Sequence, residues 1–381
     1  MSLSDVRARI DEIDARILDL FSERMEIARE VAESKALTGK AVFDPARERE
    51  KLIAAGERVP EAYRPQAHSL MSLLMSMNKA EQLRILSARA ESSRSAAALA
   101  SLKPADEPFP ATATVACQGV EGAYSQLAAC KLFRVPAITY LDSFEGVCRA
   151  VESGMCEFGV LPIENSTAGS VNAVYDLLAE YRFSIVRSVR LKVDHNLLAL
   201  PGATVGSIRE VWSHEQAIAQ CADYLDRLGC KVHVCGNTAQ AAERVARSGR
   251  TDVAALSSRS CAELYGLDVI DEDVQDEASN YTRFVCIASK PAIYAGATKT
   301  SLMLTLPHQP GSLYRVLERL YALDVNLVKL ESRPIPGHDF EFMFYFDLDC
   351  PVGSQAFASL LDALDDICER SWYFGSYSEV L

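Results

Sequence analysis

The first ninety residues have apolar positions spaced as in α-helices. Apolar side chains step along the chain by four and three residues at Val6, Ile10, Ile13, Ile17 and Leu20. Ser4, a favourable N-cap residue, precedes this run, which predicts a helix of about thirty residues, roughly 45 Å long. Two shorter helices of the same block cannot cover so long an apolar stripe. We therefore expect residues 1–90 to be all-helical and to pair with a second chain.

Polar side chains interrupt the apolar stripes of this block. Arg24 and Lys35 continue the stripe of the first helix, and Asn78 and Gln82 lie one turn apart on the apolar face of a third. Glu48 falls in the first turns of a second helix. A buried cation needs an anionic partner, so Arg24 pairs with a protein carboxylate, emerges into water or binds a ligand. Together these side chains predict a pocket suited to a small dicarboxylate that bears a hydroxyl.

The remaining chain divides into a linker and two further blocks. Residues 91–111 are rich in Ser, Ala and Pro, which is typical of a flexible linker. Residues 112–290 alternate short β-branched runs with amphipathic helices and predict an α/β domain. Residues 299–378 predict a compact β-α-β-β-α-β unit. Its expected strands are 300–306, 325–332, 341–348 and 372–377, and its expected helices are 311–322 and 354–366.

Composition and charge narrow the classes of function. The 381 residues carry a net charge of −13, and residues 1–90 are neutral, so the rest of the chain is acidic, which disfavours binding to nucleic acid. The sequence has no run of 18 apolar residues, no secretory start, and none of the motifs of phosphate loops, zinc helices or dinucleotide turns. The eleven cysteines include no Cys-x-x-Cys pair. We expect a cytoplasmic protein with reduced thiols that needs no metal and no cofactor.

Two strand-to-helix junctions of the middle block carry candidate binding groups. The glycine turn at 119–125 feeds a helix, an arrangement found both at anion sites and in plain tight turns. The polar loop at 162–170 follows a buried strand, where open α/β sheets place binding loops, although a solvated loop with local caps has the same pattern. A third segment, 280–284, enters a strand and is unremarkable as a pattern.

The helical block resembles the all-helical chorismate mutases. The resemblance rests on Val6–Asp11, Glu23-Arg24, Lys35, Asp44–Glu48 and Gln82, in that order along the chain. It implies an intertwined dimer of three-helix chains that rearranges chorismate to prephenate. Such a pericyclic reaction needs fixed donors that select the compact conformer and stabilise charge on the ether oxygen. It requires no base, metal or cofactor.

The same resemblance implies roles for the cations of the pocket. Arg7 would reach in from the partner chain to hold one substrate carboxylate, and Arg24 would bind the other. Lys35 and Gln82 would donate hydrogen bonds to the ether oxygen of the breaking bond, which makes them the catalytic pair of the mutase.

The remaining mutase positions concern the hydroxyl end of the substrate and the rim of the pocket. Glu48 and the backbone of Asp44 would hold the ring hydroxyl, and Arg47 matches a further basic position. Asn78 departs from the family, in which familiar members carry serine beside a substrate carboxylate. Asparagine can still donate a hydrogen bond there, but it is bulkier.

The middle block resembles prephenate dehydratase over its full length, 112–290. The resemblance rests on Gly119-x-x-Gly122-Ala123-Tyr124-Ser125, Pro162-Ile163-Glu164-Asn165-Ser166, Ser213-His214-x-Gln216 and Thr282-Arg283-Phe284. It implies two α/β lobes, like a periplasmic binding protein, with the site in the cleft between them. The implied reaction expels water and carbon dioxide from prephenate and leaves phenylpyruvate.

Thr282 matches the threonine to which the dehydratase family assigns the essential role. A hydroxyl is a weak acid, so we expect Thr282 to donate a hydrogen bond to the leaving oxygen. The expected substrate contacts are Ser125, Asn165, Ser166, Thr167 and Gln216, with Arg283 as the partner of a carboxylate. His214 is an alternative base, although a structural histidine that makes hydrogen bonds fits the same position.

Residues 299–378 resemble the ferredoxin-like ACT regulatory domain. The matching motifs are Gly311-Ser312-Leu313 after Pro310, at the start of a helix, and Glu331-Ser332-Arg333-Pro334, at the end of a strand. Dehydratases of this kind bind phenylalanine through these motifs, usually between two such domains. The turn at Gly311 would present backbone N–H groups to the ligand carboxylate, and Glu331 would receive its ammonium. Taken singly, the motifs would be an ordinary turn and an ion pair at a sheet edge.

The sequence thus predicts a multidomain α and α/β protein that resembles the bifunctional chorismate mutase/prephenate dehydratases. Its expected ligands are chorismate, prephenate and the inhibitor L-phenylalanine, and its expected assembly is a homodimer or higher homo-oligomer without nucleic acid or membrane. Two alternatives stay open. One is a ligand-sensing regulatory protein without catalysis, against which Thr282 and the mutase residues argue. The other is a dehydratase acting on arogenate, against which the fused mutase argues because it supplies prephenate.

Overall fold

The computed structural model describes residues 2–38, 44–89, 107–277, 279–335, 341–352, 354–365 and 367–380. The chain divides into two compact units. The first unit contains Met1–Ser101, Thr305–Leu327 and Val352–Ser371, and the second contains Leu102–Leu304, Val328–Pro351 and Trp372–Leu381. Most of the predicted linker, up to residue 106, lies outside the described residues.

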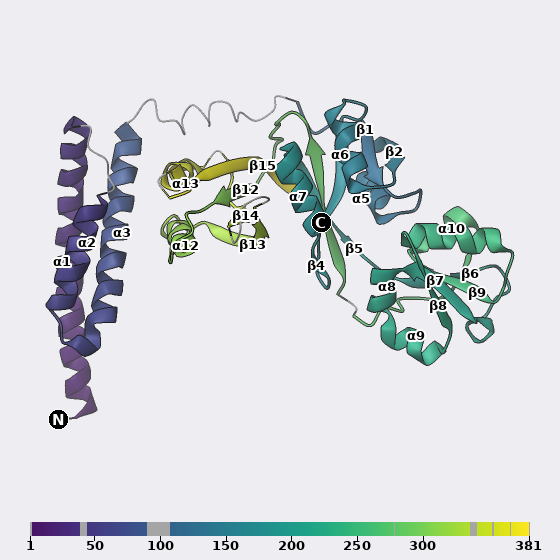
Figure 1. Cartoon of the computed structure of the whole chain (residues 1–381), viewed down its shortest axis with the longest axis horizontal. Coiled ribbons are helices and arrows are strands. Elements are labelled where there is room, and N and C mark those ends of the chain that lie inside the picture. The colour runs from purple at the N-terminus through teal and green to yellow at the C-terminus, as the bar shows by residue number, and fades with distance from the viewer. Residues whose placement is uncertain are drawn as a thin grey trace. The chain divides into compact units, whose positions relative to one another are not determined.

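The N-terminal block is helical, as predicted (Figure 1). Its elements are α1 (Leu3–Thr38), α2 (Pro45–Glu57), the 3₁₀ turn Glu61–Tyr63 and α3 (Arg64–Arg89). The start of α2 has the expected cap, because the Asp44 side chain accepts a hydrogen bond from the backbone N–H of Arg47 at 3.1 Å and Pro45 opens the first turn. At 36 residues, α1 is longer than predicted and measures roughly 54 Å.

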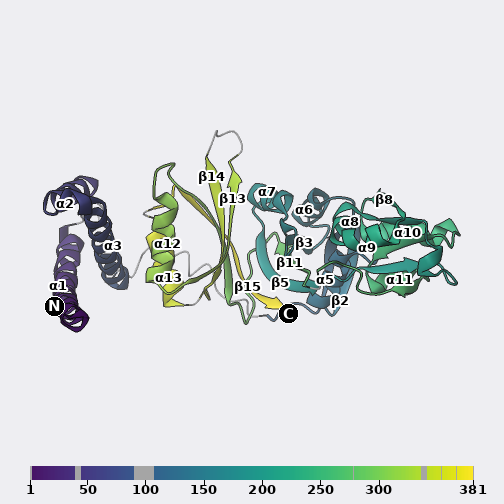
Figure 2. The same cartoon turned by 90° about the horizontal axis from the view of Figure 1, so that it is seen from below.

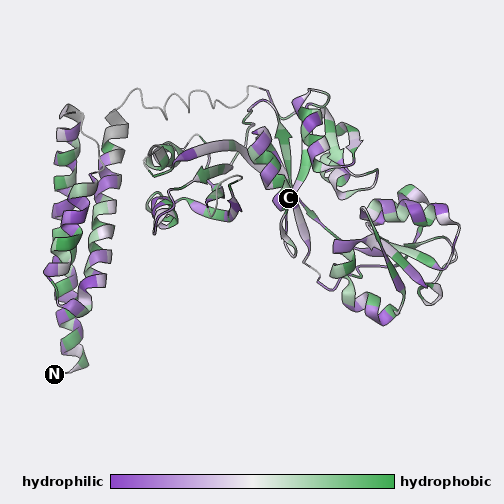
Figure 3. Cartoon of the chain, in the orientation of Figure 1, coloured by the Kyte–Doolittle hydropathy of each residue, from purple (hydrophilic) through white to green (hydrophobic). Residues whose placement is uncertain are grey.

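The apolar stripe of α1 is open in the single chain. Ile10, Ile13 and Ile17 are each about half exposed, whereas Ala28 and Ala32 are buried. Figure 3 shows hydrophobic segments recurring along the whole length of this helix. A single chain of this block therefore leaves much of its longest apolar surface in contact with water.

The first α/β lobe is built on strands of one large sheet. Its strands are β1 (Thr112–Gln118), β2 (Val135–Leu141), β3 (Phe158–Asn165), β5 (Ser184–Lys192) and β11 (Tyr281–Ala288), in the order β5-β11-β3-β1-β2. Strand β1 runs parallel to β2 and β3, and β11 runs antiparallel to β3 and β5. The helices are α5 (Tyr124–Leu132), α6 (Phe144–Glu152) and α7 (Asn172–Tyr181), and the short strand β4 (Gly169–Ser170) pairs with the end of β3.

Helices cover both faces of this sheet. Side chains of α6 and α7 share a buried cluster with Val285 and Ile287 of β11, whereas α5 shares another with Phe284 and Cys286. Successive side chains of a strand point to opposite faces, so β11 is apolar on both. The sheet is therefore fixed from both sides where its strands approach the polar loops.

The second lobe has a five-stranded sheet of its own (Figure 2). Its strands are β6 (Asn196–Ala199), β7 (Glu210–His214), β8 (Lys231–Cys235), β9 (Val253–Ser257) and β10 (Asp268–Asp271), in the order β10-β6-β9-β7-β8. Its helices are α8 (Glu215–Gln220), α9 (Ala222–Leu228), α10 (Thr238–Ser248) and α11 (Arg259–Tyr265), with a 3₁₀ turn at Val205–Ser207. The chain enters this lobe after β5 and returns at β11.

The C-terminal elements follow the predicted β-α-β-β-α-β order. They are β12 (Lys299–Thr305), α12 (Ser312–Ala322), β13 (Asn326–Pro334), β14 (Phe342–Asp349), α13 (Gln355–Asp365) and β15 (Arg370–Val380). The strands form the order β13-β14-β12-β15, and β15 then pairs in parallel with β5 through Ser378–Val380. This pairing joins the C-terminal strands and the first lobe in one sheet, which the sequence pattern did not predict. It accounts for the greater length of β15.

Candidate active sites

A cleft of about 340 Å³ in the second unit gathers residues from both α/β lobes. Four of the predicted dehydratase residues line it, namely Ser125, Asn165, Gln216 and Thr282. Its described lining contains no Asp, Glu, Lys or Arg side chain. The cleft is therefore a polar but uncharged site of a size typical for small ligands.

Helices α5 and α10 both begin at this cleft. Gly119 and Gly122 have φ values of 108° and 88° in the turn before α5, and a Cβ on Gly122 would lie 2.8 Å from the sulfur of Cys261. The glycines of the predicted anion turn are thus required by backbone conformation and packing. Asn237 caps α10 by accepting a hydrogen bond from Gln240 N at 2.7 Å, and it lines the cleft with Thr238. Backbone N–H groups at helix starts favour carboxylates without any ionised side chain.

The Asn165 side chain is held in one orientation and contacts the Thr282 hydroxyl. Its Oδ1 accepts hydrogen bonds from the backbone N–H groups of Thr167 and Ala168, at 3.1 and 2.8 Å. Its Nδ2 donates to Thr282 Oγ1 at 2.9 Å and to Asn280 Oδ1 at 2.8 Å. Because the Thr282 oxygen accepts from Asn165, its own hydrogen remains available to a ligand. The hydrogen that the predicted donor role of Thr282 requires is thus not used by Asn165.

The amide contacts continue into a closed ring. Asn280 Nδ2 donates to Gln220 Oε1 at 3.1 Å, Gln220 Nε2 donates to Thr167 Oγ1 at 2.8 Å, and that hydroxyl donates to Asn165 Oδ1 at 2.8 Å. Asn280 is 2% exposed and Asn165 is buried, whereas Thr167 closes the ring on an exposed side. Thr167 therefore supports Asn165 in the structure, and it does not line the cleft itself.

Among the cleft residues that the sequence analysis did not assign are His195 and Tyr124. The Tyr124 hydroxyl donates to the backbone oxygen of Asp194 at 2.8 Å, and burial raises the pKa of this phenol. His195 is 2% exposed, and its Nε2 lies 2.9 Å from Gln220 Oε1. Tyr124 belongs to the glycine motif quoted above, although no role was assigned to it, whereas His195 had no signal of its own because its contact comes from a segment distant in sequence. His214 also lines the cleft, with Nδ1 accepting a hydrogen bond from Gln216 N at 3.3 Å as the cap of α8.

Two other predicted contacts lie outside the cleft. Ser166 donates to the backbone oxygen of Ser279 at 3.1 Å and accepts from Tyr281 N at 2.9 Å, so it fastens the loop to β11. Arg283 is 5% exposed and pairs with Asp347 and Glu164. Because Thr282 and Arg283 are neighbours in a strand, their side chains leave opposite faces, and only Thr282 reaches the cleft. The expectation that Arg283 binds a substrate carboxylate does not fit this position.

In the helical block, Arg24 is partly buried against α3. Its Nη1 donates to the backbone oxygen of Leu74 at 2.6 Å, and burial lowers the pKa of the guanidinium. Glu48 forms an ion pair with Lys79, with 2.7 Å between Oε1 and Nζ. This backbone carbonyl does not neutralise the charge of Arg24, so the described contact is not the carboxylate pair that was one of the alternatives.

The other predicted mutase residues lie on all three helices. Gln82 is buried, and its Nε2 lies 3.4 Å from Asn78 Oδ1, so Asn78 holds the amide of Gln82. Lys35 is partly buried near the end of α1. Arg7 is exposed near its start, at the end of the open stripe. Arg47 pairs with Glu50 at 3.1 Å on the exposed side of α2.

Comparison with known proteins decides the family. A chorismate mutase type II family model matches residues 6–83, and a prephenate dehydratase model matches residues 115–292. The bifunctional chorismate mutase/prephenate dehydratase of Enterobacter agglomerans is 33% identical over 389 residues, which cover 98% of this chain and 95% of that protein. The chain belongs to the bifunctional chorismate mutase/prephenate dehydratase family. It carries a chorismate mutase domain and a prephenate dehydratase domain.

The dehydratase domain also has relatives outside the bifunctional proteins. The chloroplastic arogenate dehydratase/prephenate dehydratase 2 of Arabidopsis thaliana is 36% identical over 274 residues, 69% of this chain and 72% of the plant protein. The structure of prephenate dehydratase from Arthrobacter aurescens in complex with L-Phe matches with a TM-score of 0.64 and 27% identity, covering 70% of this chain and 89% of that one. GqqA, described as a quorum quenching acylase, matches with a TM-score of 0.63 and 34% identity, covering 69% of this chain and 97% of that one.

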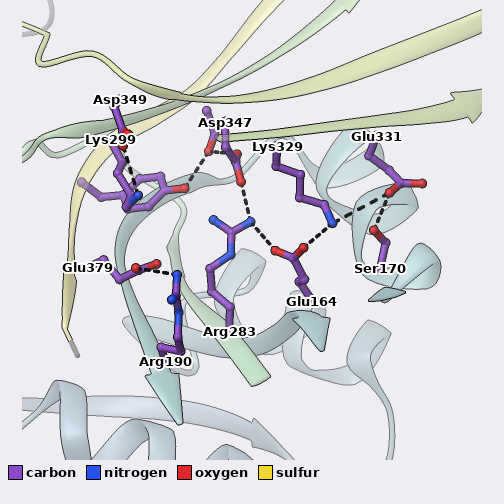
Figure 4. A network of polar contacts seen from close by, with 12 residues as sticks. Glu164, Ser170, Arg190, Arg283, Lys299, Lys329, Glu331, Asp347, Asp349 and Glu379 are labelled. Carbon is purple, nitrogen blue, oxygen red and sulfur yellow. Dashed lines mark hydrogen bonds and ion pairs between the residues drawn. The ribbon is translucent and has the colours of Figure 1, made fainter. Parts of the chain in front are cut away.

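A polar network connects the dehydratase strands with the C-terminal sheet (Figure 4). Arg283 lies between Asp347 of β14 and Glu164 of β3, with 3.3 Å to the latter, and Lys329 of β13 binds the other oxygen of Glu164 at 2.7 Å. Burial opposes the charge of Arg283, but the attraction of Asp347 outweighs it and raises the pKa of the guanidinium. Glu164 directly precedes Asn165, so this network reaches the strand end that carries the cleft residues.

The two predicted phenylalanine motifs lie in different compact units. At the first, Gly311 has a φ of 85° as the cap of α12, Ser312 is buried, and Leu313 lies in the first turn. At the second, Glu331 accepts a hydrogen bond from Ser170 of β4. Arg333 makes two contacts with Asp176 of α7, at 3.0 and 2.6 Å. The other two residues of this motif, Ser332 and Pro334, are exposed.

The described residues include no helix long and apolar enough to cross a membrane. Among the same residues, no group of three or more His, Cys, Asp or Glu side chains is arranged to hold a metal ion. All eleven cysteines are free thiols.

Proposed function

We propose that this chain catalyses two consecutive reactions of phenylalanine biosynthesis. Its helical domain rearranges chorismate to prephenate, and its α/β domain converts prephenate to phenylpyruvate, water and carbon dioxide. The observation that carries the proposal is the Thr282 hydroxyl, which accepts from Asn165 at 2.9 Å and lies in an uncharged cleft. This arrangement supplies the single donor that the dehydration needs, on the same chain as a mutase domain.

Thr282 acts on the leaving oxygen of prephenate. As the bond to the ring carboxylate breaks, its electron pair moves into the ring and expels the ring hydroxyl. The Thr282 hydrogen stabilises the charge that develops on this oxygen, and solvent supplies the proton that completes the water molecule. The hydrogen bond from Asn165 fixes the direction of the Thr282 hydroxyl and increases its polarity.

The uncharged lining suits a carboxylate that leaves as carbon dioxide. A guanidinium or ammonium would stabilise the carboxylate in the bound substrate more than in the transition state, where its charge moves away. The N–H groups at the starts of α5 and α10, with Ser125 and Gln216 nearby, bind carboxylates less strongly. We infer that these neutral groups hold prephenate and that Arg283 has a structural role.

In the mutase domain, the proposed pocket forms between two chains. Arg24, Lys35, Glu48 and Gln82 come from one chain, with Asp44, Arg47 and Asn78 at its edges, and Arg7 comes from the other. The open apolar stripe of α1 supports a homodimer, because pairing would remove this surface from water. In the pocket, Lys35 and Gln82 would donate to the ether oxygen, and Asn78 would position Gln82.

We also infer that residues 299–378 form an ACT domain that binds L-phenylalanine and inhibits the dehydratase. The strand order β13-β14-β12-β15 is that of a ferredoxin-like unit, and the Arthrobacter aurescens dehydratase structure contains L-Phe. Gly311, Ser312 and Leu313 would hold the ligand carboxylate end, and Glu331-Ser332-Arg333-Pro334 the ammonium end. Glu331 would have to exchange its hydrogen bond with Ser170 for one with the ligand. The free thiols support a reducing compartment, the cytoplasm.

Arogenate is the second candidate substrate, because a plant relative of 36% identity carries that name. Arogenate has an ammonium group where prephenate has a ketone. The described lining of the cleft has no carboxylate to pair with an ammonium, which favours prephenate. An acylase would need an activated nucleophile, but the Thr282 oxygen contacts an amide rather than a base.

The test is product formation by the purified chain from chorismate, prephenate and arogenate, each with and without phenylalanine. We expect phenylpyruvate from chorismate and from prephenate, inhibited by phenylalanine, and far slower turnover of arogenate. Phenylalanine formed from arogenate faster than phenylpyruvate from prephenate would reverse the assignment of the substrate. No conversion of chorismate would contradict the bifunctional assignment.

A further inference from the structure

The ring of His195 has one nitrogen for which the described protein offers no partner. The residue is 2% exposed and lines the cleft that contains Thr282. Its Nε2 contacts Gln220 Oε1 at 2.9 Å, whereas its Nδ1 is buried and has no hydrogen-bond partner among the described residues. A buried polar atom without a partner is costly, so its presence beside a reaction site calls for an explanation.

The amide ring decides which nitrogen of His195 carries the hydrogen. Two backbone N–H groups fix Asn165 Oδ1 as an acceptor, so Asn165 Nδ2 donates to Asn280 Oδ1. Asn280 must then present its Nδ2 to Gln220, which makes the facing atom of Gln220 an acceptor. An acceptor at 2.9 Å requires a donor, so His195 Nε2 carries the hydrogen.

The Nδ1 atom of His195 is therefore a hydrogen-bond acceptor as long as the ring is neutral. Burial lowers the pKa of His195 against the opposing influences of Gln220 and Asp194, which favours the neutral form. A neutral imidazole with its hydrogen on Nε2 presents a lone pair at Nδ1. His195, a residue of the cleft lining, thus carries one acceptor atom that no described group uses.

Prephenate offers a single group that such an acceptor can bind. At neutral pH its two carboxylates and its ketone have only acceptor atoms, and the ring hydroxyl is its only donor. We propose that His195 Nδ1 accepts the hydrogen of this ring hydroxyl and so orients the leaving group. The proposal rests on the function proposed above, because it assumes that prephenate occupies the cleft.

This contact would complete the recognition of the leaving oxygen. His195 accepts a hydrogen bond from the ring hydroxyl. This contact directs a lone pair of the hydroxyl oxygen toward the donor Thr282. The same amide ring holds both protein groups, since Asn165 contacts Thr282 and Gln220 contacts His195. His195 transfers no proton and acts by orientation.

Two substitutions separate this role from a purely structural one. The amide of His195→Asn falls near the place of Nδ1 and can accept from the substrate, but it loses the contact with Gln220. The amide of His195→Gln falls near the place of Nε2 and keeps that contact, but it loses the acceptor. We expect kcat for prephenate to fall about tenfold in His195→Asn and about a hundredfold in His195→Gln. His233→Asn, on β8 and outside the cleft, is the matched control and should match the wild type.

The rates are measured as phenylpyruvate formation, with mutase turnover of the same samples as a check that each chain is folded. Greater activity in His195→Gln than in His195→Asn would mean that His195 acts only by holding Gln220, and would overturn the proposal. Wild-type activity in both variants would overturn it as well. A wild-type chain that forms no phenylpyruvate at all would instead refute the proposed function.

A measurement on the wild-type chain covers the case in which the variants do not fold. The full chain is labelled with ¹⁵N-histidine and titrated with two saturated analogues of prephenate, one with the ring hydroxyl and one with hydrogen in its place. We expect the Nδ1 resonance of one histidine to shift upfield with the hydroxyl analogue only. Equal shifts with both analogues, or none with either when both bind, would refute the contact.

Discussion

The proposed mutase pocket and the dehydratase cleft differ in the groups that would bind their related dicarboxylate substrates, charged in the first and uncharged in the second. In our proposal the mutase pocket would rely on cations, Arg24 and Lys35 in one chain and Arg7 in its partner. The described lining of the dehydratase cleft has amides, hydroxyls and helix starts and no ionised carboxylate, ammonium or guanidinium. The mutase helices also leave an apolar stripe open, whereas the cleft residues come from one compact unit.

The difference follows from what happens to the substrate carboxylates. Both carboxylates survive the mutase reaction, so strong charge pairing holds the substrate without opposing a step. In the dehydratase reaction one carboxylate must lose its charge. A strong ion pair with this carboxylate would stabilise the bound substrate more than the transition state and so slow the reaction. Arg283 and Glu164 of the dehydratase domain do not line the cleft, and Arg283 pairs with Glu164 and with Asp347 of the C-terminal strand β14. Substitutions at each site test this division, starting with the largest expected effect.

Thr282→Ala should abolish most dehydratase turnover. The change removes the hydrogen bond to the leaving oxygen, so kcat for prephenate should fall by roughly 10²- to 10⁴-fold. Mutase turnover should be unchanged because Thr282 belongs to the other domain. Thr282→Ser keeps the hydroxyl and should retain part of the activity. Normal turnover of prephenate in the alanine variant would move the search for the donor to other residues of the cleft, His214 among them.

Arg24→Ala should affect the mutase alone. Loss of a charge-assisted contact to a substrate carboxylate should cost about 2–4 kcal/mol, roughly 30- to 1,000-fold in kcat/KM for chorismate. Conversion of supplied prephenate should stay at the wild-type rate. If chorismate turnover also persisted, Arg24 would have no place in the pocket.

Mixing variant chains tests whether the mutase pocket is shared. Arg7→Ala and Arg24→Ala chains should each be nearly inactive, but a mixed dimer contains one pocket with both arginines. Co-refolded mixtures should therefore recover part of the mutase activity. Proven heterodimers without any recovery would show that each pocket belongs to one chain, and the contrast with the dehydratase cleft would lose its basis.

Asp347→Ala should destabilise the dehydratase region without touching the cleft. It leaves the buried charge of Arg283 with Glu164 alone, so the free energy of unfolding should fall by about 3 kcal/mol. Asp349→Ala, two residues further on β14, is the matched control, because its ion pair with Lys299 at 3.1 Å is far more exposed. It should cost less than about 1 kcal/mol. Denaturant unfolding of both variants and the wild type gives the comparison, and equal losses would contradict it.

Glu331→Ala and Leu313→Ala should have the smallest effect on uninhibited turnover. Both should raise the phenylalanine concentration needed for half inhibition by about tenfold, because each removes one contact to the effector. Dehydratase rates against phenylalanine, together with calorimetric binding, provide the measurement. Unchanged inhibition in both variants, or inhibition competitive with prephenate in the wild type, would place phenylalanine in the cleft.

The sequence correctly predicted those features of the sites that depend on short-range patterns. The cap at Asp44, the glycine turn before Ser125 and the strand end at Asn165 all follow from short-range spacing, and the structure contains each of them. Arg283 was expected to bind a substrate carboxylate as part of the motif Thr282-Arg283-Phe284. The alternation of side chains along a strand already implies that the two residues face opposite ways.

The missed residues depend on contacts between distant segments. His195 is separated from Gln220 by 25 residues and from the rest of the amide ring by more, and a lone histidine before a buried strand has no distinctive pattern. The pairing of β15 with β5 was missed for the same reason, because either strand alone resembles an ordinary member of its own sheet. Local periodicity predicts elements, whereas the partner of an edge strand depends on the whole chain.

The pairing of β15 with β5 limits how this protein can be divided for engineering. A truncated chain that ends before residue 299 would strip β5 of its neighbour and turn it into an edge strand beside β11. Unpaired N–H and C=O groups along such an edge invite pairing between chains and aggregation. A soluble dehydratase without its C-terminal elements would need a charged or proline-bearing replacement along 187–189. Exchange of the C-terminal block between relatives would likewise have to preserve the last strand residues.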